Sequence, residues 1–117
     1  MLRIFEQHSD LFESWHLLRY EQEGDAYILH IVVYFRDSSR LDLRDYAFAD
    51  GHRKYAYHWM NVDGTLRCRW DNAPHWPNVG TAPHHQHLPG QVLPEPSLIT
   101  NLEDLFAFIA EKFALEL

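Results

Sequence analysis

Turn signals that recur at a fixed interval are the feature of this sequence that most constrains its fold. They centre on Gly24, Asp37, Asp50 and Asp63, each 13 positions after the one before. Two of them are Asp-Gly pairs, which tolerate the positive φ angles of tight hairpin turns. Because the segments between the turns are rich in β-branched and aromatic residues, they predict an antiparallel β-meander. The predicted strands cover residues 26–36, 40–48, 53–61 and 65–71, with a fifth strand within 11–22.

Side-chain alternation separates two faces of this predicted sheet. In segment 65–71, one face holds Leu66, Cys68 and Trp70 and the other holds Arg67, Arg69 and Asp71. Successive side chains of a strand point to opposite faces, so the first set is expected in the core. Cys68 is therefore predicted to be a buried, inert thiol.

The C-terminal segment has the spacing of an amphipathic helix. Its apolar residues recur every three or four positions, at Leu102, Leu105, Phe106, Ile109 and Phe113. Thr100 or Asn101 can cap the helix. The prediction is one α+β domain over residues 1–117. It has an antiparallel β-meander of four to five strands, a long Pro/His-rich loop and a C-terminal helix packed on one sheet face.

That loop, residues 72–97, has an unusual composition. It contains all six prolines of the chain and four of its nine histidines, but a single charged residue, Glu95. Loops longer than about 12–15 residues are usually functional or disordered. Trp76 and Leu88 argue against disorder, so the loop is expected to be ordered and to lie across the sheet.

The charge balance limits the classes of function. A formal net charge of −7 opposes a protein that grips nucleic acid by bulk electrostatics, although protonation of nine histidines would reverse the sign. One cysteine rules out an internal disulfide and a multi-thiolate zinc site. No apolar run is long enough to span a bilayer and no signal peptide is recognisable. We expect a cytoplasmic protein without membrane association.

Histidine, arginine and aspartate gather where the last predicted strand meets the loop. His85 and His87 point the same way in an extended backbone, and Arg67 and Arg69 are spaced to bind a phosphate. Metal-free RNA cleavage needs such a set: a base for the 2′-hydroxyl, cations for the phosphorane and an acid for the leaving oxygen. The predicted catalytic residues are His58, Asp71, His75, His84, His85 and His87. The predicted RNA- or phosphate-binding residues are Arg44, Arg67, Arg69, Trp70 and Asn72.

Structural roles compete with each of these assignments. Histidine-rich loops more often pack and hydrogen-bond than catalyse, strand arginines commonly pair with neighbouring acids, and Asp71-Asn72 is a good turn opener. The His-x-His pair is also a candidate ligand for zinc, nickel or copper, but no metalloprotease or zinc-finger spacing is present. Metal-free chemistry without a cofactor is therefore preferred to a metal-dependent hydrolase. A non-enzymatic module that binds a protein or a small ligand is a further alternative.

Several motifs together resemble the TumE-type toxins of toxin–antitoxin pairs. They are YHW at 57–59, RWDNAPH at 69–75, PHHQH at 83–87, the Pro-Glu-Pro at 94–96 and the Leu-Glu-Asp-Leu helix. The resemblance covers residues 12–109 and departs at Trp76, where a second histidine is common in the family. It implies a small toxin that interferes with translation through RNA and is neutralised by a cognate helix-turn-helix antitoxin. The sequence leaves the oligomeric state open, a homodimer included.

Overall fold

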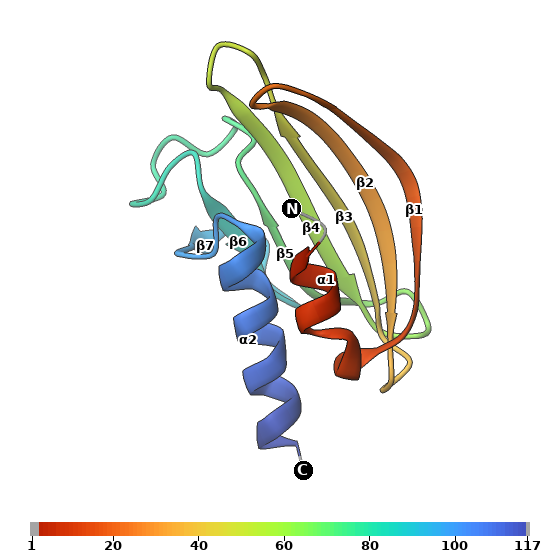
Figure 1. Ribbon diagram of the computed structural model, residues 1–117. Helices are drawn as coiled ribbons and strands as arrows, with labels where there is room; N and C mark the ends of the chain where they lie inside the picture. The colour runs from red at the N-terminus through yellow and green to blue at the C-terminus, as the bar shows by residue number, and fades with distance from the viewer. Residues whose placement is uncertain (1–2, 117) are drawn as a thin grey trace.

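A computed structural model describes residues 3–116 of the chain, and these residues form an α+β fold (Figure 1). A seven-stranded antiparallel sheet within this range follows the chain order from β1 to β7. The strands are β1 (Phe12–Glu23), β2 (Ala26–Phe35), β3 (Arg40–Ala47), β4 (Arg53–Met60), β5 (Leu66–Asp71), β6 (His85–His87) and β7 (Glu95–Pro96). The helices are α1 (Arg3–Gln7), a 3₁₀ turn (Ser9–Leu11) and α2 (Leu102–Leu115). No helix among the described residues is long and apolar enough to cross a membrane.

The predicted meander is confirmed, but the predicted strand count of four to five is wrong. The first five strands are those that the turn signals separate, and Gly51 and Gly64 have the positive φ that such turns require. The two additional strands come from the loop between β5 and α2, where β6 pairs with β5 and β7 with β6. This pairing supplies hydrogen-bond partners for the β5 edge. The loop is ordered, as expected, but part of it extends the sheet instead of crossing it.

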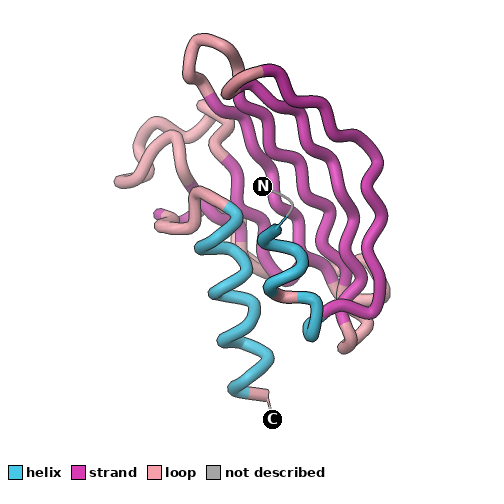
Figure 2. Tube along the Cα trace, in the orientation of Figure 1, coloured by secondary structure: helices cyan, strands magenta, loops and turns pink. Residues whose placement is uncertain are grey.

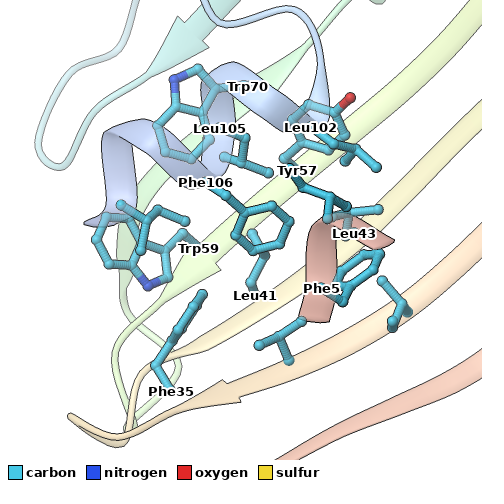
Figure 3. Close-up of a cluster of buried hydrophobic side chains, with 14 of the residues drawn as sticks. Phe5, Phe35, Leu41, Leu43, Tyr57, Trp59, Trp70, Leu102, Leu105 and Phe106 are labelled. Atoms are coloured by element: carbon cyan, nitrogen blue, oxygen red, sulfur yellow. The ribbon is translucent and has the colours of Figure 1, made fainter. Parts of the chain in front are cut away.

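Both helices lie on one face of the sheet, as Figure 2 shows. Leu105, Phe106 and Ile109 of α2 are fully buried, and the Phe106 ring packs edge-on against Phe5 of α1 at 5.3 Å between centroids (Figure 3). Asn101 caps α2, because its side chain accepts a hydrogen bond from the Asp104 backbone N–H at 2.8 Å. The predicted packing of the C-terminal helix is thus confirmed, and α1 adds a second element to the same layer.

Alternation along β4, and along β5 from Cys68 to Asp71, follows the prediction on the helix-covered face. Tyr57, Trp59, Cys68 and Trp70 are buried beneath the helices. Burial raises the pKa of the Cys68 thiol to about 12, so this cysteine is neutral at physiological pH. We call the opposite side of the sheet the open face, because neither helix covers it.

Candidate functional site

The pairing of β5 with β6 builds the candidate site. In this antiparallel register Asp71 lies opposite His85, and Arg69 lies opposite His87. Directly opposed residues share a face, so all four side chains point to the open face at one end of the sheet. The expectation that His85 and His87 point the same way is confirmed.

Asp71 is the centre of the resulting cluster. Its Oδ1 lies 2.9 Å from His85 Nε2, and its Oδ2 lies 3.1 Å from Arg69 Nε and 3.8 Å from His87 Nε2. Oδ1 also accepts a hydrogen bond from the Ala73 backbone N–H at 3.0 Å, which makes the predicted Asx turn part of the site. The carboxylate is buried, so its orientation is set by these groups and not by water.

The two histidines of β6 differ in burial and in their hydrogen-bond partners. His85 is buried, and its Nδ1 lies 2.8 Å from the carbonyl oxygen of Pro83. A carbonyl only accepts hydrogen bonds, so Nδ1 carries a proton and Nε2 faces Asp71. His87 is about one-quarter exposed. Partial burial lowers the pKa of His87, and the charge of Arg69 acts in the same direction, although Asp71 opposes both.

These side chains open onto a cavity of about 670 Å³, which we call the Asp71 pocket. Lys54 and Arg53 of β4 form one wall, and the loop from Asn72 to Trp76 forms another. Asp71 is the single acidic residue among the described lining residues. The pocket is therefore cationic even though the whole chain is acidic.

The structure also brings His75 and Asn72 to the pocket. His75 is an exposed lining residue. Asn72 has a structural task there: its Oδ1 accepts from the Tyr55 backbone N–H at 3.0 Å, and its Nδ2 donates to the Arg53 carbonyl at 2.8 Å. Both bonds fix the position of the β4 wall.

A second hollow on the open face holds two more of the predicted residues. His58 and Arg44 line it together with Asp42, and it shares Arg69 and Lys54 with the Asp71 pocket. The His58 ring nitrogen Nδ1 lies 3.4 Å from Arg69 Nη1. Burial and the Arg69 charge lower the pKa of His58, which favours the neutral imidazole.

His84 and Trp70 lie away from the pocket. His84 precedes β6 and turns to the helix side of the sheet, where its Nδ1 lies 2.7 Å from the Tyr55 hydroxyl and its ring stacks on Tyr55. The Trp70 side chain is completely buried and packs against Phe108 of α2, so neither of its ring faces is available to a nucleic acid base.

Arg67 is also separated from the cluster. Met60 pairs with Leu66 and Trp59 with Cys68, so Arg67 is the extra residue of a β-bulge. Its guanidinium lies over the Trp59 ring and donates to Asp37 Oδ2 at 2.7 Å, in the turn after β2. The expectation that Arg67 and Arg69 share one strand face is therefore wrong, because the bulge breaks the alternation.

The Arg67–Asp37 pair predicts a pH-dependent contribution to stability. Burial raises the pKa of Asp37, but hydrogen bonds from Ser39 and Arg67 outweigh it and hold the pKa below the usual value of 3.8. A depressed folded-state pKa gives stability that is present above about pH 4 and lost as the pH falls through the folded pKa. We expect Asp37→Asn to lose about 1 kcal/mol at pH 7 and less at pH 3, measured by urea unfolding. A difference that does not change with pH would contradict this role.

Sequence reasoning missed Lys54 as a lining residue. The available signal was its position four residues before His58 on the same face of a strand, which places both side chains on the open face. The loop wall from Ala73 to Trp76 had no such signal, because its course depends on contacts distant in the sequence.

Comparison with known proteins gives one match. A family model described as "Toxin TumE" matches residues 1–113 of the 117-residue chain. The match includes every residue of the Asp71 pocket. No curated protein and no solved structure matches the chain significantly.

Proposed function

Because the chain belongs to the TumE family, the toxin component of toxin–antitoxin systems, we propose that it arrests growth by cleaving RNA in the Asp71 pocket. The observation that carries this proposal is the β5–β6 register. It sets a carboxylate, two imidazoles and a guanidinium around one cavity. Perturbed ionisable groups that converge in a pocket are typical of active sites.

The cations of the pocket fit a phosphodiester substrate. Arg69 and Lys54 line both the Asp71 pocket and the neighbouring hollow, so they form a short basic track on the open face. A phosphate in the pocket would meet positive charge there, although the chain as a whole is acidic. Recognition would then depend on a few close contacts and not on the net charge.

Cleavage of RNA uses the neighbouring 2′-hydroxyl or a water molecule as nucleophile. The pocket has to withdraw a proton from it, stabilise charge on the phosphorus oxygens and protonate the leaving oxygen. In this proposal Arg69 and Lys54, which line the pocket, serve the second task, and the exposed imidazole of His75 transfers a proton. His85 has both ring nitrogens engaged, so it positions Asp71 and does not exchange protons with a substrate. The sequence favoured metal-free chemistry, whereas the positions of Asp71, His85 and His87 favour the metal-dependent alternative.

A test of this proposal compares two lysines. Purified protein is incubated with total RNA in the presence of Mn²⁺ or Zn²⁺, and fragments are separated on a gel. We expect the wild type to cleave, and Lys54→Gln to cleave about tenfold less efficiently, since it lacks one charge-assisted contact to phosphate. Lys112→Gln is the matched control, because Lys112 lies on α2 over the Phe108 ring and far from the open face.

Two outcomes would contradict the proposal. Growth arrest that leaves total RNA and messenger RNA intact would exclude nuclease action. Tight binding of RNA, protein or a small ligand without any cleavage would favour the alternative of a non-enzymatic binding module.

Family membership also implies an antitoxin partner. That this partner is a helix-turn-helix protein, and that the pair meets in the cytoplasm, are predictions from the resemblance. Co-expression with the product of the neighbouring gene tests them, since a cognate antitoxin should abolish the arrest and copurify with the chain.

A further inference from the structure

We propose that Asp71, His85 and His87 form a binding site for one divalent ion of a first-row transition metal, such as Zn²⁺, Mn²⁺ or Co²⁺. Each residue offers one ligand atom, and these atoms all lie within 4.8 Å of one another. Two of the three residues are buried, so the cluster is not a chance gathering of exposed groups.

The sheet holds the three ligands before any ion arrives. His85 and His87 occupy alternate positions of β6, which directs both rings to the open face. Asp71 ends β5 directly opposite His85, at hydrogen-bonding distance across the ladder. Ligands on two paired strands lose little conformational freedom on binding, which favours a preorganised site.

The distances within the cluster are compatible with ligands that surround one ion. The His85 Nε2–Asp71 Oδ1 distance of 2.9 Å suits either a shared proton or two ligands of one ion. The His87 Nε2–Asp71 Oδ2 distance of 3.8 Å is too long for a hydrogen bond. Ligand atoms about 2.0–2.2 Å from one ion lie about 3–4 Å apart, so both distances fit an ion held by the two imidazoles and the two oxygens of the Asp71 carboxylate.

Outer contacts of the ligands have the pattern of a metal site. His85 Nδ1 donates to the Pro83 carbonyl, which directs the lone pair of Nε2 toward Asp71 and His87. Asp71 in turn accepts from Arg69 Nε and from the Ala73 backbone N–H, and these bonds fix the plane of the carboxylate. Such hydrogen bonds orient metal ligands and set their basicity.

The donor set selects the kind of ion. Two imidazoles and one carboxylate suit Zn²⁺ and the neighbouring transition metals, whereas Mg²⁺ and Ca²⁺ prefer oxygen ligands. Three protein ligands leave coordination positions open toward the pocket. The ion would also add positive charge beside Arg69 and Lys54, where a phosphate oxygen could become a further ligand. This last step rests on the proposed RNA cleavage, whereas binding of the ion does not.

Cobalt binding tests the site without any assay of activity. Untagged full-length protein is stripped with a chelator and titrated with Co²⁺, while its d–d absorption and the bound metal per chain are measured. We expect one Co²⁺ per chain and a loss of affinity of more than about 100-fold in Asp71→Ala and in His87→Ala, since each removes a ligand. His52→Ala is the matched control. His52 pairs with Asp50 at 2.8 Å but is fully exposed on a turn, so its loss should leave Co²⁺ binding unchanged.

A positive signature comes from His87→Cys. Its thiolate should retain the ion and add a thiolate-to-cobalt charge-transfer band in the near ultraviolet, which a merely structural role of His87 cannot produce. Absence of stoichiometric Co²⁺ binding by the folded wild type, or binding that His87→Ala leaves unchanged, would overturn the proposal. A protein that binds Co²⁺ as expected but never cleaves RNA would keep the metal site and refute the proposed function.

Discussion

Asp71→Asn is expected to abolish growth arrest and to lower any RNA cleavage by about 100-fold or more. Asparagine keeps the shape of the side chain and the turn to Ala73, but it removes the negative charge that Arg69, His85 and His87 face. Asp71 is also a ligand of the proposed metal site, and even changes to groups that only orient metal ligands typically cost about 10–100-fold in activity. The measurement is the growth rate after induction, with the antitoxin absent.

Asp42→Asn is the matched control for this prediction. Asp42 also lies on the open face, and it likewise pairs with a histidine and an arginine: His30 at 3.0 Å and Arg44 at 3.8 Å. It does not line the Asp71 pocket. Asp42→Asn should remain toxic, and both variants should unfold near the wild-type temperature. Undiminished arrest by a folded Asp71→Asn protein would show that the toxic site lies elsewhere.

Asp45→Ala is expected to cost about 3–5 kcal/mol of unfolding free energy, a large part of the stability of a domain of this size. The Asp45 carboxylate is almost completely buried and accepts hydrogen bonds from Tyr27 at 2.8 Å, from Arg53 at 2.8 Å and from the Tyr57 hydroxyl. Burial and the Asp45 charge raise the pKa of Tyr27 to about 12 and raise that of Tyr57 as well, so both hydroxyls remain donors. Alanine would leave the Arg53 guanidinium without its carboxylate partner.

A double-variant experiment separates the cost of leaving Arg53 unpaired from the cost of losing the Asp45 side chain itself. Arg53 also donates to the Thr100 carbonyl at 2.7 Å, just before α2 begins, so the Asp45 cluster ties the sheet to that helix. Urea unfolding of Asp45→Ala, Arg53→Met and the double variant gives their coupling. We expect the double variant to lose less unfolding free energy than the two single variants lose together, because it no longer contains an unpaired Arg53 charge. Asp42→Ala, on the same strand, should cost under about 1 kcal/mol. Strictly additive losses would refute the coupling.

Local signals account for the part of the fold that could be predicted. The hairpins from β1 to β5 follow from turn residues and alternation within the strands, and α2 follows from its spacing and its Asn101 cap. Strands β6 and β7 have three and two residues, which is too short for a periodic pattern. They exist because β5 offers an unpaired edge, and that edge is a property of the assembled sheet.

The residues of the candidate site could likewise be predicted only in part. Asp71, His85 and His87 were grouped by residue type, and their side-by-side placement follows from a register that the sequence does not display. His84 differs from His85 by one position, and that single step moves it to the opposite side of the sheet. Arg67 was misplaced because a β-bulge reverses the expected side and leaves no mark in the sequence.

The chain-order arrangement of the sheet has a consequence for biosynthesis. Each strand from β2 to β5 pairs with the strand before it, so these strands can associate in sequence while the polypeptide is still being made. His85 and His87 emerge only afterwards, and Leu105, Phe106 and Ile109, which seal the core, emerge later still. A ribosome that stops before β6 therefore releases a product that lacks both the α2 part of the core and the histidines of the proposed site. Under the proposed function, activity would then require translation to have continued through α2.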